Sequence, residues 1–207
     1  MMCFFYACEI MSAFLVFLIV FVMVRGAWNR REIRVSVSAC AVMIAFSAYV
    51  IGVYHFTGAG TLYDGLNYSL EIRREQLNII PFSRDIDVAA YGLNVLLFVP
   101  FGVFVPMIWK QMDGKWHVFG TSLLFSMLIE GSQLLNNRRT DIDDLIMNTV
   151  GAVIGYVLYT VWDKFTKSKY QLSGFAAVEL PVYILILFAG RFLLFNEMGL
   201  AGLLYGF

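Results

Sequence analysis

The sequence has little charge, and this shortage decides its class. Of its 207 residues, 14% are charged and 60% are hydrophobic, whereas a soluble domain has about 25% charged and about 45–50% apolar residues. The apolar residues come in long blocks, which indicates an integral membrane protein. The 15 basic and 15 acidic residues cancel, so the chain lacks the basic surface that would predict a nucleic-acid partner.

Several motifs that carry chemistry in other proteins are absent. The three cysteines have no CxxC spacing and no neighbouring histidines, so we expect no disulfide framework, no metal and no cofactor. The sequence contains no G-x-x-x-x-G-K-[ST] segment, which argues against ATP-driven transport by this chain alone. No inverted repeat of the kind that secondary transporters carry is visible either.

The apolar blocks predict the fold. Each is long enough to cross a bilayer as a helix, and they lie at approximately 4–24, 35–57, 90–109, 117–135, 145–162 and 178–195. The first block has no basic residue ahead of it, so we interpret it as an uncleaved span and not as a signal peptide. We therefore expect an all-α, polytopic transmembrane bundle of about six spans. Its expected parts are an N-terminal two-span segment (1–60), a central domain (61–162) and a C-terminal loop with the last helix (163–207).

The loops differ in charge, which predicts an orientation. Loops 25–34, 110–116 and 163–177 carry nine lysines and arginines, whereas 58–89 and 136–144 carry five over a greater length. The positive-inside rule then places the first group inside the cell and both termini outside. Within the long loop, residues 71–75 look like a short interfacial helix, and the apolar run 78–82 looks like a segment that dips into the membrane. A solvated connector is the alternative.

Polar residues gather around one loop of this apolar chain. Asn94 lies near the start of the third block, Glu130 and Gln133 near the end of the fourth, and Asp144 and Asn148 at the start of the fifth. Successive spans run antiparallel, so these positions share one membrane face. An ionisable residue in a membrane segment is a functional-site hypothesis by default. The candidate site residues are Asn94, Glu130, Gln133, Arg138, Asp141, Asp143, Asp144 and Asn148.

Spacing along the fifth block adds a prediction about packing. Asp144 and Asn148 are four residues apart and so lie on one helix face. Gly151 and Gly155 continue that face, and a small-xxx-small pattern lets a second helix approach closely. Because lipid cannot satisfy polar side chains, we expect this face to contact protein.

Three interpretations of the candidate site remain open. In a structural one, Asp141 or Asp143 caps a helix and the nearby arginines neutralise the other carboxylates. In a catalytic one, Glu130 and Asp144 act as general acid and base on a lipid-linked substrate. In a binding one, amides, carboxylates and Arg138 form a polar pocket for a head group, a glycan or a peptide, with a divalent cation as a variant.

Polar residues outside this region have simpler expected roles. Arg191 is placed to pair with Glu130 or Asp144, or to extend to the interface. His55 has no polar neighbours in the sequence, so we expect it to pack at the interface. Glu179 is expected to be an acidic residue of a helix N-terminus.

Four motifs resemble a known family in their order and spacing. They are Asn78-Ile79-Ile80-Pro81-Phe82, the run from Asn94 to Gly102, Glu130-x-x-Gln133, and Arg138-x-x-Asp141-Ile142-Asp143-Asp144 followed by Asn148-x-x-Gly151. Together they resemble the VanZ-like family of bacterial membrane proteins, over residues 78–160. The chain departs from the family pattern at Arg138-Arg139-Thr140, where one arginine usually precedes a small and an apolar residue. Gapless matching selects Arg138 for the family position.

The resemblance implies a multi-pass protein of the bacterial cytoplasmic membrane that is connected with teicoplanin resistance. Teicoplanin carries an acyl chain that vancomycin lacks, so membrane anchoring separates the two drugs. We therefore expect altered cell-envelope sensitivity to lipoglycopeptides, through binding of a lipid-linked or acylated ligand in an outward-facing polar pocket.

The expected partners are membrane lipids or a lipid-linked cell-wall precursor, with a lipoglycopeptide as a further candidate and no nucleic acid. The alternatives are an intramembrane enzyme that acts on a lipid-linked envelope substrate, or a small transporter or transporter subunit.

Overall fold

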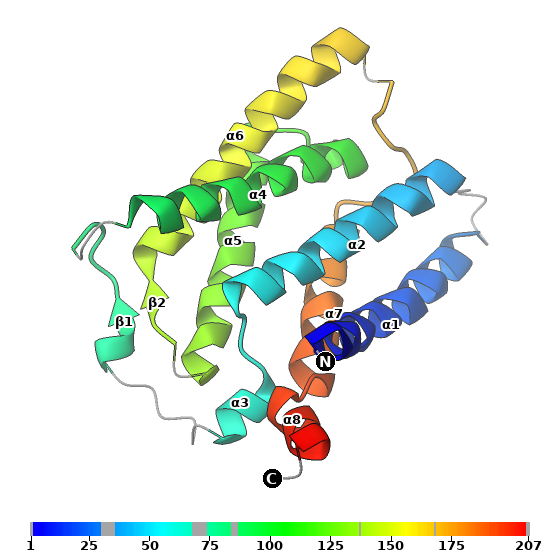
Figure 1. Cartoon of the computed structure of the whole chain (residues 1–207). Coiled ribbons are helices and arrows are strands. Elements are labelled where there is room, and N and C mark those ends of the chain that lie inside the picture. The colour runs from blue at the N-terminus through cyan, green and yellow to red at the C-terminus, as the bar shows by residue number, and fades with distance from the viewer. Residues whose placement is uncertain are drawn as a thin grey trace.

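The computed structural model describes residues 2–29, 36–67, 74–83, 87–136, 138–167 and 169–205, and its long helices form a bundle (Figure 1). These helices are α1 (Met2–Asn29), α2 (Val37–Thr57), α4 (Val88–Ile108), α5 (Lys115–Gln133), α6 (Ile142–Thr166) and α7 (Glu179–Leu194). Within the described residues, five helices are long and apolar enough to cross a membrane. The 16-residue α7 lies beside α1 (Figure 1). The expected all-α transmembrane bundle is confirmed.

Short elements lie between the long helices and, in the case of α8, after the last of them. They are α3 (Leu62–Asn67), α8 (Glu197–Tyr205), the 3-10 turns η1 (Arg74–Gln76), η2 (Lys110–Met112) and η3 (Leu134–Asn136), and the strands β1 (Leu77–Asn78) and β2 (Thr140–Asp141). The two strands pair in parallel, with Leu77 opposite Thr140 and Asn78 opposite Asp141. The sequence predicted neither this pairing nor α8.

Side-chain caps set the starts of three long helices. Ser36 accepts a hydrogen bond from Ala39 N at the start of α2, and Asp87 caps α4. Asp141 accepts from Asp143 N, so α6 begins at Ile142, three residues before the predicted start. A cap of this kind satisfies backbone N–H groups that would otherwise lack a partner, and it lets the helix begin in a polar stretch.

Glycines bring α4 and α6 into close contact. A Cβ added to Gly151 would lie 2.2 Å from Val95 O, and one added to Gly155 would lie 2.0 Å from Val99 O. From the other side, a Cβ on Gly102 would lie 1.9 Å from Ala152 O. This confirms the predicted small-xxx-small contact and shows that its partner is α4.

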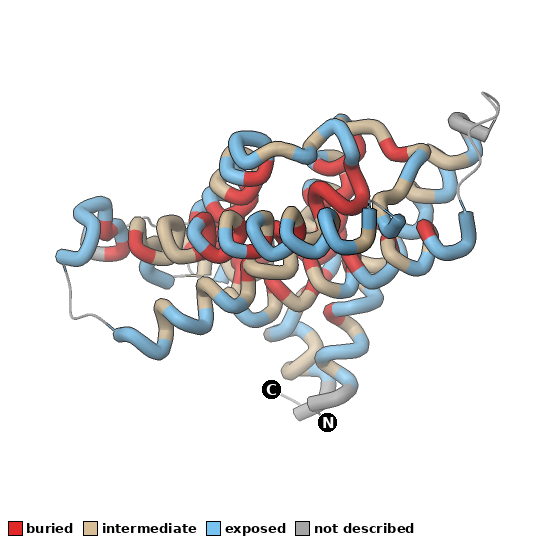
Figure 2. The backbone as a smooth tube through the Cα atoms, turned by 90° about the horizontal axis from the view of Figure 1, so that it is seen from above, coloured by how far each residue is buried: buried red, intermediate tan, exposed pale blue. Residues whose placement is uncertain are grey.

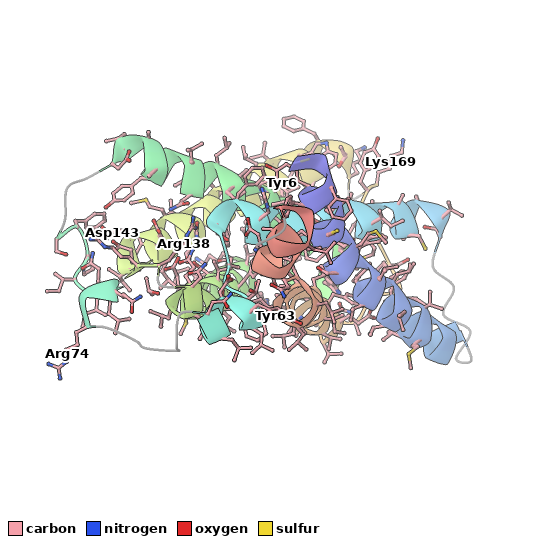
Figure 3. All side chains as sticks on the ribbon, turned by 60° about the horizontal axis from the view of Figure 1, so that its bottom comes forward. Tyr6, Tyr63, Arg74, Arg138, Asp143 and Lys169 are labelled. Atoms are coloured by element: carbon pink, nitrogen blue, oxygen red, sulfur yellow. The ribbon has the colours of Figure 1, made fainter. Side chains whose placement is uncertain are left out.

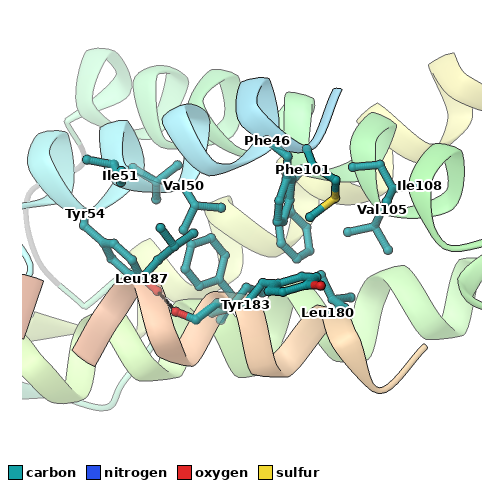
Figure 4. Packing of buried hydrophobic residues seen from close by; sticks show 14 of the residues in the cluster. Phe46, Val50, Ile51, Tyr54, Phe101, Val105, Ile108, Leu180, Tyr183 and Leu187 are labelled. Carbon is teal, nitrogen blue, oxygen red and sulfur yellow. Dashed lines mark hydrogen bonds between the residues drawn. The ribbon is translucent and has the colours of Figure 1, made fainter. Parts of the chain in front are cut away.

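The apolar core lies between α2, α4, α5 and α7. Phe46, Tyr54, Phe101 and Tyr183 are fully buried there (Figure 4), and the Tyr54 hydroxyl donates to Ile184 O at 2.9 Å. Buried residues follow the inner faces of the helices, and exposed turns lie on the outside (Figure 2). Large apolar side chains on those outer turns suit a lipid environment.

The two ends of the bundle hold different polar groups. At one end, Glu179 is buried and forms an ion pair with Arg25, in addition to its expected place in the first turn of α7. At the other end lie both chain termini, the β1–β2 pair, α3 and α8 (Figure 1). Residues 30–35, 68–73 and 84–86 lie outside the described residues, so the loop-charge argument and most of the predicted 71–75 helix stay predictions.

The α4–α6 contact makes a matched pair of glycine substitutions informative. We expect Gly155→Ala to destabilise the protein by about 1–3 kcal/mol, because the added methyl group collides with backbone. Gly120 in α5 has open space around its Cβ position, so Gly120→Ala should be neutral or stabilise by up to about 1 kcal/mol. Thermal unfolding of the detergent-solubilised protein measures both, and equal melting temperatures would contradict the close contact.

Candidate functional site

Four carboxylates come together where α5 ends and α6 begins. We call Glu130, Asp141, Asp143 and Asp144 the carboxylate cluster. Asp141 N donates to Glu130 Oε2 at 3.1 Å, and Asp143 N donates to Asp141 Oδ1 at 3.0 Å. Glu130 is 4% exposed and Asp143 is 2% exposed. Because Asp141 is also the cap of α6, one residue both begins the helix and orients the acidic groups around it.

The segment that precedes α4 and the first turn of α4 supply several donors to the cluster. Asn78 Nδ2 donates to both oxygens of Asp141, at 3.0 and 3.1 Å. Phe82 N donates to Asp143 Oδ1 at 2.8 Å, and the Tyr91 hydroxyl donates to Asp143 Oδ2 at 2.5 Å. In the sequence, Asn78 and Phe82 belong to an apolar run and to one of the family motifs, without a predicted role at the site, and nothing singles out Tyr91. The β1–β2 pair brings Asn78 next to Asp141, which is 63 residues later in the sequence. A local periodicity in the sequence cannot predict such a contact.

Among the amides predicted for the site, one contacts the cluster. Asn94 Nδ2 donates to Asp144 Oδ1 at 2.6 Å, which links the start of α4 to the start of α6. Asn148 Nδ2 instead donates to Ser126 Oγ in α5 at 2.9 Å. Gln133 Nε2 donates to a backbone carbonyl at the end of α2, at 2.7 Å. These last two amides join helices, and they do not contact the carboxylates.

No cation neutralises the cluster within the described residues. The ion pairs found there involve Arg25, His55 and Arg191, and none reaches the four carboxylates. Arg138 Nη1 instead donates to Thr57 O at 2.8 Å, and Figure 3 labels Arg138 and Asp143 at the same end of the bundle. Hydrogen-bond donors to the cluster are therefore neutral amide, hydroxyl and backbone groups. Among the described residues, no three His, Cys, Asp or Glu side chains are arranged so that they could hold a metal ion, and this includes the four carboxylates of the cluster.

A second polar region lies at the same end of the bundle, between α1, α2 and α7. It is a cavity of about 350 Å³, which we call the arginine cavity. Its charged and titratable lining residues are Glu9, His55, Asp64, Arg138, Arg191 and Glu197. Arg138 thus belongs to this cavity, although the sequence grouped it with the carboxylates.

A buried ion pair forms one wall of the arginine cavity. Arg191 Nε donates to Glu9 Oε1 at 2.7 Å, and His55 Nδ1 lies 2.7 Å from Glu9 Oε2. The expected pairing of Arg191 with Glu130 or Asp144 is wrong, because α7 packs against α1. His55 lies near the end of α2, as expected, but it has a polar neighbour in Glu9, because α1 also packs against α2. Glu9 was overlooked, although an acidic residue inside an apolar span is itself a signal.

Comparisons with known proteins identify a family that the chain matches. The model of the VanZ/LLP1 family matches residues 10–163. Protein VanZ from Enterococcus faecium is 32% identical over 116 residues, which cover 55% of this chain and 71% of that protein. No solved structure matches. The family match includes the whole carboxylate cluster together with Asn78, Tyr91 and Asn94.

Removing one partner of the buried ion pair should be costly. Glu9 and Arg191 side chains are 5% and 8% exposed, so Glu9→Ala leaves a guanidinium buried without its carboxylate. We expect a loss of about 3–5 kcal/mol in the free energy of unfolding. The double variant Glu9→Leu with Arg191→Met removes both charges and should recover most of that loss. Thermal unfolding in detergent measures this, and a double variant as unstable as Glu9→Ala would argue against the pair.

Proposed function

The chain belongs to the VanZ/LLP1 family, and on this premise we propose that it alters the sensitivity of the bacterial cell envelope to lipoglycopeptides such as teicoplanin. The proposed mechanism is binding of an acylated or lipid-linked ligand at the carboxylate cluster. Family membership and the apolar helices support an integral membrane protein. We place it in the bacterial cytoplasmic membrane, with the cluster facing outward.

The observation that carries the proposal is the lack of a counter-charge for the cluster among the residues that the structure describes. The cluster holds four carboxylates, and no described residue supplies them with a cation. Taking a carboxylate out of water is costly unless an opposite charge compensates it. An ammonium group on a ligand would supply that charge, and complementary charge across an interface favours the correct partner. A ligand that carries both an amine and an acyl chain fits a negatively charged site at the end of a membrane bundle.

The cluster is also held in a fixed arrangement before any ligand arrives. Asn78, Tyr91 and Asn94 each donate to a different carboxylate of the cluster. Side chains fixed by hydrogen bonds of this kind lose little conformational entropy on binding, which favours affinity. The donors come from the β1 strand and α4, and the carboxylates from α5, β2 and α6. A ligand at the cluster would therefore touch the part of the bundle where three membrane helices meet.

An intramembrane enzyme is the second candidate, and one observation favours it. Glu130 Oε2 and Asp144 Oδ1 accept hydrogen bonds, whereas the other oxygen of each has no partner among the described residues. Each side chain therefore keeps one oxygen that can exchange a proton with a substrate. In this alternative, Glu130 and Asp144 act as acid and base on a lipid-linked envelope substrate.

Drug sensitivity in a susceptible Gram-positive host tests the proposal. Wild type should raise the inhibitory concentration of teicoplanin and leave that of vancomycin nearly unchanged. Glu130→Gln and Asp144→Asn should abolish the rise, because losing one charge-assisted contact weakens binding by about 1.5–3 kcal/mol, or about tenfold to a hundredfold. Asp87→Asn is the matched control, since it removes a carboxylate outside the cluster and asparagine still caps α4.

Matched membrane levels are required for every variant. Wild-type resistance in both cluster variants would contradict the proposal, and so would the absence of a rise with wild type. Mass spectrometry of the host lipids then separates the two candidates. A new or depleted lipid that returns to normal in Glu130→Gln would favour the enzyme over the binding protein.

A further inference from the structure

An apolar groove continues from the arginine cavity along the outside of the bundle. It lies between α1 and α2 and has a volume of about 570 Å³. Tyr6, Glu9 and His55 line both the groove and the cavity, so the two spaces share a wall. The groove then follows Phe14 on α1 and Ala48 on α2. Ala48 and His55 are seven residues apart, which places the far end of the groove about 10 Å deeper along the helix.

One of the two arginines that line the cavity is available to bind an anion. Arg191 is neutralised by Glu9, but Arg138 has no carboxylate partner within the described residues. A Cβ on Gly58 would lie 2.0 Å from Arg138 Nη1, so the guanidinium rests directly on the backbone after α2. Nη1 donates to Thr57 O, and the remaining N–H groups of Arg138 are free to bind an anion. A guanidinium binds phosphate with two parallel hydrogen bonds.

Carboxylates, which could bind a positively charged group, also line the cavity. Asp64 and Glu197 line the cavity, and Glu197 is exposed at the start of α8. Asn136 Nδ2 donates to Gly58 O, and its buried Oδ1 has no hydrogen-bond partner. An oxygen of this kind requires a donor. A primary ammonium provides N–H donors as well as positive charge, whereas a quaternary ammonium provides charge alone.

From this arrangement we infer a phospholipid site that is separate from the carboxylate cluster. Its occupant is a phospholipid whose head group carries one phosphate and one primary ammonium. Arg138 binds the phosphate, Asp64, Glu197 and Asn136 Oδ1 surround the ammonium, and an acyl chain follows the groove between α1 and α2. The site lies at the end of the bundle where head groups meet water, and its groove runs toward the membrane interior.

Lipid binding by the purified full chain tests this site. Native mass spectrometry in detergent would compare phosphatidylethanolamine with phosphatidylglycerol and phosphatidylcholine at equal concentrations. We expect the ethanolamine lipid to bind about tenfold more tightly than the other two. Arg138→Gln should weaken the affinity for the ethanolamine lipid by about the same factor. Arg139→Gln is the matched control, because Arg139 is the adjacent arginine and does not line the cavity.

Two further variants separate recognition from folding. Gly52 lines the groove and has open space around its Cβ position, so Gly52→Leu should block the acyl chain without a backbone collision. Gly120→Leu is its control on α5. Glu197→Gln should reduce the preference for ethanolamine over choline while the melting temperature stays unchanged, because that substitution removes only charge at the cavity mouth.

The outcomes decide the inference independently of the proposed function. Glu130 lies outside this site. The Glu130→Gln variant should therefore bind the ethanolamine lipid as wild type does, whatever its effect on drug sensitivity. Equal binding of the three lipids would overturn the inference. Undiminished binding by folded Arg138→Gln or Gly52→Leu would overturn it as well.

Discussion

The close contact between α4 and α6 is the constraint on which the carboxylate cluster depends. Gly151 and Gly155 let the two backbones meet at Val95 and Val99. Asn94 immediately precedes Val95, and its amide therefore reaches Asp144 at 2.6 Å. With larger residues at the glycines, the helices would separate and this hydrogen bond would be lost. A packing feature in the apolar part of the bundle thus sets the geometry of the polar end.

The polar end divides its charges between two places. Carboxylates collect around β2 and the start of α6, where neutral donors from β1 and α4 hold them. Two arginines line the arginine cavity, where Glu9 neutralises Arg191 and Arg138 has no carboxylate partner among the described residues. The cluster presents carboxylates and the cavity presents a guanidinium, so they select for different ligand groups. This separation is why the drug-related proposal and the phospholipid site can be tested independently.

The sequence predicts the helices well, because long apolar blocks have few other outcomes in a membrane. It also predicts the glycine face of α6 and that Asn94, Glu130 and Asp144 lie at one end of the bundle. It does not predict which helices are neighbours. Arg191 contacts Glu9 at a separation of 182 residues, and only the packing of α7 against α1 brings them together. Arg138, Asn148 and Gln133 were grouped with the carboxylates at this end of the bundle, whereas their hydrogen bonds go to Thr57 and Ser126.

The glycine face of α6 has a consequence for association between copies of this chain. Stripes of small residues are a common means by which membrane helices of separate molecules dimerise. Here α4 of the same chain occupies that stripe, at Gly151 and Gly155. This stripe is therefore closed to a second copy, and a homo-oligomer would form elsewhere, for example through outward-facing surfaces that carry large side chains such as Leu124, Leu158 and Leu185. Interfaces of that kind pack helices at a greater separation, so quaternary structure would leave the α4–α6 pair intact.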